Sequence, residues 1–389
     1  MEPESRINKD AVGDPNEKIQ PSSLPPPPEF NLDHYQQMLK QTPKMVIIFA
    51  AIALSCLVIY HSSITLPFSG DYMRPYISGN HHANSNINVG QLSRILKSAA
   101  MDNNTVIITS LNDAWAEPQS MFDLLLESFR IGNQTQRFLK HLVVVTVDQK
   151  AYARCMKLHP HCYHLLTDGM DFSGEADFMT PDYLKIVWRK IDLLSKVLEL
   201  GYSFVFTDAD IMWFRDPFSQ FDKDDDIQIS CDFFNGNPFD LRNLPNTGFS
   251  YVKSNEKTIQ LYKFWYNSSM TYPGIHDQDA FNRIKSNPFI RNLGLRIRFI
   301  DTTYFGGFCQ PSRDLNKVCT MHANCCVGLE NKVHDIGIML DDWRKYIKSV
   351  ANQTTTDGYR GSWTIPQLCR GSFRRPRSPK KKAGQGRKS

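Results

Sequence analysis

Continuous apolar runs alternate with amphipathic stretches through the middle of the chain. The runs at 105–110, 141–147 and 202–206 are rich in β-branched and aromatic residues without polar alternation, which is typical of strands buried on both faces. Between them, apolar residues recur at helical spacing over 121–129 and 184–198. This order of strand, helix and strand predicts an α/β fold with a mostly parallel sheet and flanking helices.

The pattern becomes mixed after residue 210. The elements expected there are short strands at 227–230, 248–252 and 297–300, and helices that include 259–265, begin at 277 and cover 341–350. The turn after the first strand lacks the spacing G-x-G-x-x-G, which argues against a dinucleotide-binding fold.

The N-terminal part of the chain predicts a membrane anchor. Residues 1–44 are polar and proline-rich, as expected of a disordered cytosolic arm, and residues 45–66 are nearly uncharged and long enough to cross a bilayer. Lys40 and Lys44 precede this segment and the next basic residue is Arg74, so the positive-inside rule places the rest of the chain in a lumen. A secretory signal peptide is the alternative, but the segment starts far from Met1 and no small-residue cleavage site follows.

The lumenal part is expected to contain a stem at 67–102, one globular domain at 103–369 and a disordered basic tail at 370–389. The tail holds nine Lys and Arg residues and no acidic ones, although the whole chain has a net charge of only +5. The fold itself is therefore slightly acidic, and we expect no nucleic-acid partner.

Glycosylation sequons and cysteines agree with a lumenal location. The sequons all follow the predicted anchor, at Asn103, Asn133, Asn267 and Asn352. Eight cysteines follow Cys56, and among them Cys155 and Cys162 are a plausible local disulfide, whereas the other six cannot be paired from sequence. A zinc site near Cys325-Cys326 and His322 is the alternative, but the ligand spacing is unusual for zinc.

Two carboxylates one residue apart, Asp208 and Asp210, follow the apolar run at 202–206. In an extended chain both side chains point to the same side, where they can share a divalent cation or bridge it to phosphate oxygens. A polar turn that closes a strand is the alternative. Asn112 and Asp148 also follow predicted strands, and because ligands of such sheets bind beyond the carboxyl ends of the strands, all four residues are expected at one cleft.

The segment 208–218 resembles the plant nucleotide-diphospho-sugar transferases of glycosyltransferase family 77, and so do 188–191, 246–249 and 321–329. The likeness spans roughly residues 103–350. It implies a single lumenal domain of the Rossmann-like GT-A type, a Golgi type II membrane protein, a nucleotide-sugar donor and retention of configuration at the transferred sugar. Members of the family act on cell-wall glycans or on hydroxyproline arabinosides.

The resemblance assigns roles at the diphosphate end of a donor site. It implies that Asp208 and Asp210 hold Mn²⁺ or Mg²⁺ on the diphosphate of a UDP-sugar, and that His322 is a third metal ligand. A buried histidine near the disulfides is the alternative for His322. Arg189 or Lys190 is expected to reach the phosphates, against the alternative of a solvated helix face, and Asn112 and Asp148 are candidates for contact with the uridine or ribose, or are strand-end turns.

The resemblance also implies a sugar-binding and catalytic side of the site. The segment Asp277-Gln278-Asp279 resembles the acidic stretch that lines the sugar in retaining GT-A enzymes, although such residues also suit a helix N-terminus. Asn246, Thr247 and Gly248 are expected beside the sugar or acceptor, or form a plain turn. An aspartate of the segment could be a nucleophile, but attack on the same face as the leaving phosphate is favoured.

The sequence thus predicts a metal-dependent, retaining transferase that moves a pentose or galactose from a UDP-sugar to a polysaccharide or glycoprotein. Expected partners are the membrane, through residues 45–66, and other Golgi glycosyltransferases. A catalytically silent sugar-binding or scaffold protein of the same fold is the alternative. The basic tail suggests contact with an acidic polysaccharide.

Overall fold

A computed structural model describes residues 87–165, 179–352 and 361–372. The predicted cytosolic arm, the predicted anchor at 45–66 and most of the predicted stem lie outside these residues. Within them, no helix is both long and apolar enough to cross a membrane.

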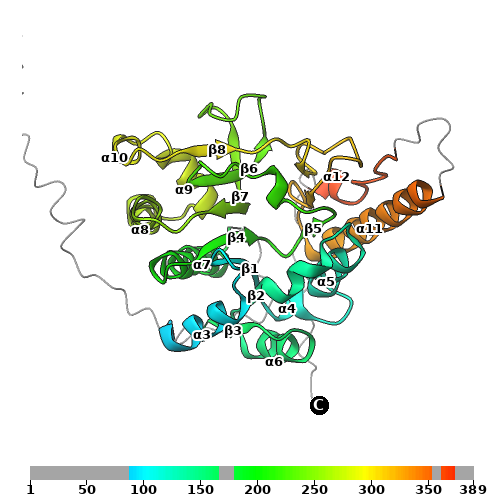
Figure 1. Cartoon of the computed structure of the whole chain (residues 1–389), viewed down its shortest axis with the longest axis horizontal. Coiled ribbons are helices and arrows are strands. Elements are labelled where there is room, and N and C mark those ends of the chain that lie inside the picture. The colour runs from blue at the N-terminus through cyan, green and yellow to red at the C-terminus, as the bar shows by residue number, and fades with distance from the viewer. Residues whose placement is uncertain (1–86, 166–178, 353–360, 373–389) are drawn as a thin grey trace, which may run out of the picture. The chain divides into compact units, whose positions relative to one another are not determined.

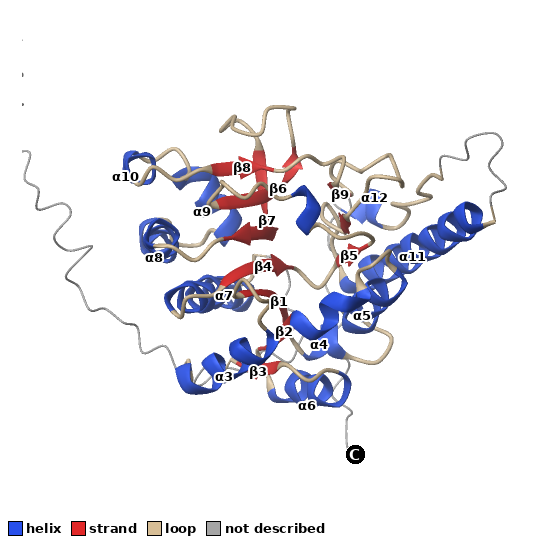
Figure 2. Cartoon of the chain, viewed as in Figure 1, coloured by secondary structure: helices blue, strands red, loops and turns tan. Residues whose placement is uncertain are grey.

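A mixed sheet of seven strands lies at the centre of the described residues (Figure 2). Its strands are, in spatial order, β3 (Cys162–His164), β2 (Leu142–Thr146), β1 (Thr105–Leu111), β4 (Ser203–Thr207), β7 (Leu244–Val252), β6 (Ile227–Phe233) and β8 (Ile297–Phe299). Strand β7 is antiparallel to both of its neighbours, whereas all the other neighbouring pairs are parallel. The predicted α/β fold with a mostly parallel sheet is confirmed.

Helices cover both faces of this sheet (Figure 1). One face carries α3 (Val89–Ala99), α7 (Pro181–Glu199), α8 (Glu256–Thr271) and α9 (Asp277–Ile284), and the other carries α5 (Met121–Ile131), α6 (Gln149–Leu158) and α11 (Leu329–Ala351). In β1, Val106 and Ile108 pack with the first group and Ile107 with the second. Because both faces are covered, the strands read in the sequence as unbroken apolar runs.

The predicted boundaries at α3 and α11 shift in the structure. Helix α3 lies within the predicted stem, yet it buries Leu92 and Leu96 against the sheet and so belongs to the globular unit. Helix α11 is much longer than the predicted 341–350, because its first two turns are mostly polar and lacked an apolar period. The remaining short elements are α4 (Asp113–Ala116), η2 (Gln136–His141), η3 (Phe218–Gln220), α10 (Pro288–Asn292) and α12 (Cys369–Ser372).

A second, three-stranded sheet was not predicted. It joins β5 (Ile211–Trp213), β10 (Thr320–His322) and β9 (Phe305–Gly307), with β5 antiparallel to β10 and β9 parallel to it. In this register His322 pairs with Ile211, the residue after Asp210. The small sheet therefore brings a histidine from late in the chain to the end of β4.

Three disulfides connect Cys155 to Cys162, Cys309 to Cys325 and Cys326 to Cys369. The predicted local pair is confirmed. The alternative of a zinc site at Cys325-Cys326 is wrong, because each of these adjacent cysteines is bonded to a different distant partner. Cys231 and Cys319 are buried free thiols.

The sequon asparagines stay candidates for glycosylation. Asn103, Asn133 and Asn352 are exposed, and Asn267 is half-buried on α8.

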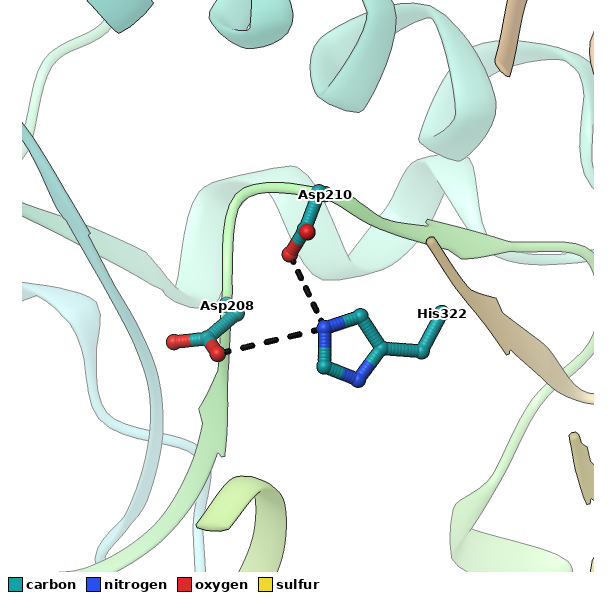
Figure 3. A group of neighbouring side chains, drawn as sticks. All are labelled: Asp208, Asp210 and His322. Carbon is teal, nitrogen blue, oxygen red and sulfur yellow. Dashed lines mark ion pairs between the residues drawn. The ribbon is translucent and has the colours of Figure 1, made fainter. Parts of the chain in front are cut away.

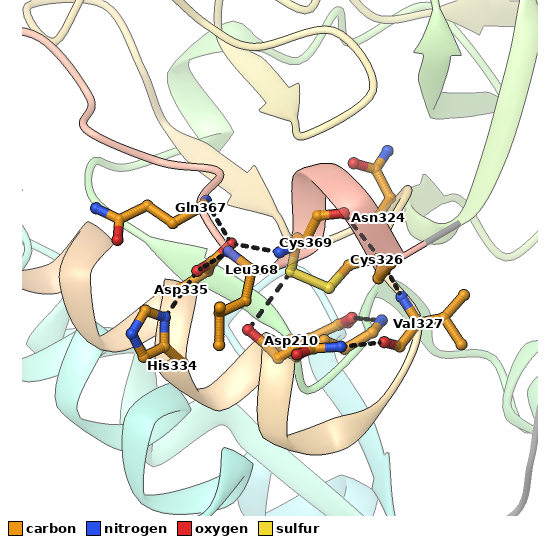
Figure 4. The surroundings of a disulfide bond; sticks show 12 residues. Asp210, Asn324, Cys326, Val327, His334, Asp335, Gln367, Leu368 and Cys369 are labelled. Atoms are coloured by element: carbon orange, nitrogen blue, oxygen red, sulfur yellow. Dashed lines mark hydrogen bonds and ion pairs between the residues drawn. A yellow bond between two sulfur atoms is a disulfide. The ribbon is translucent and has the colours of Figure 1, made fainter. Parts of the chain in front are cut away.

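The buried carboxylate of Asp335 on α11 holds the C-terminal segment, next to the disulfide of Cys369 (Figure 4). It accepts hydrogen bonds from the backbone N–H groups of Gln367, Leu368 and Cys369, at 2.8, 3.1 and 3.0 Å. Residues 370–372, expected in the disordered tail, consequently form part of α12. Burial acts to raise the pKa of Asp335, but hydrogen bonds from His334 and from these backbone groups outweigh it, and the pKa is lowered.

We expect Asp335→Asn to lower the free energy of unfolding by about 2 kcal/mol, because an amide leaves some of these buried N–H groups without an acceptor. Because the pKa of Asp335 is lower in the folded than in the unfolded protein, its carboxylate stabilises the fold at pH values above the unfolded-state pKa. That stabilisation is lost as the pH falls through the folded-state pKa. Below about pH 4, the free energy of unfolding measured with denaturant should therefore fall more steeply with decreasing pH in the wild type than in the variant. Equal pH profiles would contradict this role.

Candidate functional site

Asp208, Asp210 and His322 meet where β4 turns into β5 (Figure 3). His322 Nε2 lies 3.1 Å from Asp210 Oδ1 and 4.0 Å from Asp208 Oδ2. One ligand atom from each residue lies within 4.8 Å of the others. Asp210 is 2% exposed, whereas Asp208 remains partly open. The structure thus brings together the three residues predicted as metal ligands.

The electrostatics of this triad fit a bound cation. The pKa of Asp208 is raised, by burial first and by the neighbouring Asp210 as well, although Lys190 opposes the rise. Burial acts in the opposite direction on His322, but Asp210 and Asp208 outweigh it and raise the imidazole pKa. Both carboxylates thus favour positive charge beside them, which a bound divalent cation would supply. Two carboxylate oxygens and an imidazole nitrogen are a donor set for a divalent cation.

Gly248 leaves the space into which the triad fits. Its carbonyl accepts a hydrogen bond from the Asp208 backbone N–H at 2.7 Å, so β7 passes directly beside the triad. A Cβ at residue 248 would lie 2.4 Å from Asp208 Oδ2 and 2.8 Å from His322 Cε1. Only glycine is compatible with this arrangement.

Lys332 on α11 completes this side of the site and was not predicted. Its Nζ lies 2.5 Å from Asp210 Oδ2 and 5.6 Å from the centre of the Trp115 ring. With His322 it outweighs the effect of burial on Asp210, whose pKa is lowered. The local sequence does not distinguish Lys332 from surface lysines, since only the packing of α11 places it here.

On the opposite side, Asp277 begins α9 and is 2% exposed. Its Oδ2 lies 2.7 Å from Lys190 Nζ and accepts a hydrogen bond from Thr247 Oγ1 at 3.1 Å. Burial acts to raise the pKa of Asp277, but Lys190 and His276 lower it further than burial raises it. Asp277 is therefore an ionised, paired carboxylate.

Asp232, near the end of β6, was not predicted as a site residue. Its Oδ1 accepts hydrogen bonds from the side-chain amides of Asn246 and Asn324, and its Oδ2 accepts one from Gln278, all at 2.8 Å. Three separate segments thus fix this one carboxylate. Its place at a strand end is the one sequence feature that could have indicated it.

These groups line one cavity of about 440 Å³. The predicted residues on its wall are Asn112, Lys190, Asp208, Asp210, Asn246, Thr247, Gly248, Asp277, Gln278 and His322. Of the four residues expected to converge at the strand ends, Asn112, Asp208 and Asp210 line this cavity and Asp148 does not.

Three predicted residues are not among the side chains that line this cavity. Arg189 pairs with Asp192 at 3.0 Å. Asp148 accepts from the backbone N–H groups of Ala151 and Asp113, and so caps α6 and joins it to α4. Asp279 is mostly exposed and lies 3.3 Å from His276. Their predicted roles stay predictions.

Comparison with known proteins agrees with this geometry. Residues 137–336 match the family described as nucleotide-diphospho-sugar transferase. An uncharacterised protein of Arabidopsis thaliana is 49% identical over 72% of this chain and 73% of its own.

More distant relatives carry functional names. An A. thaliana UDP-D-xylose:L-fucose alpha-1,3-D-xylosyltransferase is 22% identical over 74% of this chain and 82% of its own. The solved structure of a glycosyltransferase involved in glycosylation of the major capsid of PBCV-1 matches 59% of this chain and 98% of its own, at 10% identity and a TM-score of 0.35. The chain belongs to the plant nucleotide-diphospho-sugar transferases of glycosyltransferase family 77.

Proposed function

We propose that this protein is a metal-dependent, retaining glycosyltransferase of the GT-A type. It moves a pentose or galactose from a UDP-sugar to a cell-wall glycan or glycoprotein acceptor. Residues 45–66 anchor it in the Golgi membrane with the globular unit in the lumen. The xylosyl activity in the name of the 22% identical relative supports a pentose donor.

The observation that carries this proposal is the triad of Asp208, Asp210 and His322 at the wall of the cavity. Bound Mn²⁺ would supply Lewis-acid assistance to the departure of a diphosphate. Asp208 and Asp210 would hold it from the β4–β5 turn, and His322 from β10. The raised pKa of Asp208 supports this assignment, because it marks a partly enclosed carboxylate whose charge is incompletely balanced.

Two lysines place ammonium groups on the cavity wall, each paired with an aspartate. Lys332 lies beside Asp210, and Lys190 lies beside Asp277, so positive charge flanks the triad from α11 and from α7. An ammonium group is a strong donor to phosphate oxygens. The nucleotide would thus lie against the ends of β1 and β4, where Asn112 and Trp115 line the wall.

The sugar side supports attack from the face of the leaving group. Asp277 Oδ2 already engages Lys190 and Thr247, and the residue is only 2% exposed, which leaves this carboxylate poorly placed to act as a nucleophile. The Gln278 side chain accepts from the Thr247 N–H at 3.2 Å and donates to Asp232. Asp232 keeps a partly exposed carboxylate on the wall, suited to accept a hydrogen bond from a sugar or acceptor hydroxyl.

We expect Asp232→Asn to lower sugar transfer by about a hundredfold, because the substitution removes a charge and turns an acceptor into a donor within a network of amides. Manganese-dependent UDP affinity should change much less, since Asp232 is not a member of the triad. Initial rates and UDP titrations on the same preparations measure both effects. An unaltered transfer rate would contradict the assigned role.

A panel of UDP-arabinose, UDP-xylose and UDP-galactose tests the function directly. The full-length protein in detergent should release UDP from at least one donor in the presence of Mn²⁺, and Asp210→Asn should not. The catalytically silent sugar-binding or scaffold protein is the alternative. Binding of UDP without turnover of any donor, with or without a glycan extract, would favour it.

A further inference from the structure

The loop that connects β6 to β7 exposes an unusual set of apolar side chains beside the cavity. Phe233 and Leu244 form a cross-strand pair at its base and are 52% and 51% exposed. Phe239 and Leu241 are exposed further along the same loop. This loop stands above β6 at the top of Figure 1.

The loop is held by polar contacts that leave these side chains outside. Asn243 is fully buried, and its side chain donates to the carbonyls of Asn237 and Asp240 and accepts from the Asn235 N–H. Lys285 Nζ donates to the Asn243 carbonyl at 2.7 Å. The loop thus buries a polar amide and exposes apolar side chains, which reverses the usual arrangement. Such an exposed apolar group indicates a contact surface.

This apolar pair lies close in sequence to two residues of the cavity wall. Phe233 directly follows Asp232, and Leu244 precedes Asn246 by two residues. Asp232 and Asn246 both line the cavity, and their side chains are hydrogen-bonded at 2.8 Å. On the other side, the Gln310 side chain accepts from the N–H of Phe234 and donates to its carbonyl, which fixes the loop to the cavity-lining Cys309 segment.

We infer that Phe233 and Leu244 form a platform for the acceptor, and that the acceptor is a neutral sugar chain that packs the apolar face of a ring on this pair. The inference rests on the proposed function, since transfer requires the acceptor beside the donor at the mouth of the cavity. The two charged side chains of the loop, Asp240 and Arg242, pair at 2.6 Å. The platform therefore offers little net charge with which to select an acidic chain.

The test measures binding of labelled oligosaccharides to the full-length protein with Mn²⁺ and UDP present. The probes are neutral arabino-, xylo- and galacto-oligosaccharides and, for comparison, acidic oligogalacturonides. The wild type should bind at least one neutral probe in preference to the acidic ones, and Phe233→Ser combined with Leu244→Ser should weaken that binding about tenfold. Met270→Ser, which alters a side chain that is 74% exposed on α8, is the matched control and should bind as the wild type does.

The outcomes separate this inference from the proposed function. If UDP binding depends on Mn²⁺ but the double variant binds the neutral probes as well as the wild type does, the platform is wrong and the transferase proposal stands. Preference for the acidic probes, or no binding of any neutral probe, also overturns the platform. A change in sedimentation without a change in sugar binding assigns the pair to self-association instead. If the wild type itself shows no Mn²⁺-dependent binding of UDP, the proposed function is refuted.

Discussion

Asp210→Asn is expected to lower sugar transfer by at least about a hundredfold, because it removes the carboxylate that both His322 and Lys332 contact. The loss should appear in the turnover number as well as in donor affinity, since metal assistance acts on the departure of the diphosphate. Initial rates of UDP release over a range of Mn²⁺ concentrations measure both.

Asp341→Asn provides the matched control for this substitution. Asp341 also lies in an ion pair, with Arg344 at 2.6 Å, but it is exposed on α11. Its variant should show wild-type rates and unfolding. Equal activities of the two variants would mean that charge at Asp210 has no special part in the reaction.

Gly248→Ala is expected to reduce Mn²⁺-dependent UDP binding by about a hundredfold while the protein stays folded. The added methyl group would lie 2.4 Å from Asp208 Oδ2 and 2.8 Å from His322 Cε1, so the triad must spread. Metal ligands tolerate little displacement, because coordination distances are fixed to within a few tenths of an ångström. Calorimetric titration with Mn²⁺ and UDP measures the effect, and circular dichroism monitors the fold.

Gly337→Ala controls for the loss of a glycine. A Cβ at residue 337 meets no atom within 4 Å, and in the middle of α11 alanine is favoured over glycine. This variant should bind Mn²⁺ and UDP as the wild type does and unfold at slightly higher denaturant. If Gly248→Ala bound Mn²⁺ and UDP as tightly as the wild type does, the three residues of the triad would not hold the metal together in the arrangement that Gly248 allows.

The sequence predicted the strands β1, β2 and β4 and the two aspartates of the triad for local reasons. Strands β1, β2 and β4 are covered on both faces, so their apolar runs are unmistakable, and Asp208 and Asp210 stand at the end of the third run. The position of His322 came from the resemblance. The small sheet that carries it could not be predicted, since its short strands pair only through contacts between distant parts of the chain.

Lys332 and Asp232 were missed for a different physical reason. Each depends on where a whole element packs: α11 brings Lys332 to Asp210, and β6 and β7 bring Asp232 to Asn246. The disulfide partners of Cys309 and Cys326 are equally non-local. Conversely, Asp148 stands at a strand end as expected, yet its carboxylate caps α6 and accepts a hydrogen bond from the first residue of α4.

The most direct test of the metal-dependent donor site is a titration of the full-length protein with UDP, with and without Mn²⁺. Wild-type protein should bind UDP at least about tenfold more tightly when Mn²⁺ is present, and this dependence should vanish in the variant that combines Asp208→Asn and Asp210→Asn. Equal UDP affinity with and without Mn²⁺, or unchanged Mn²⁺ dependence in the double variant, would contradict the assignment of the triad as the metal site.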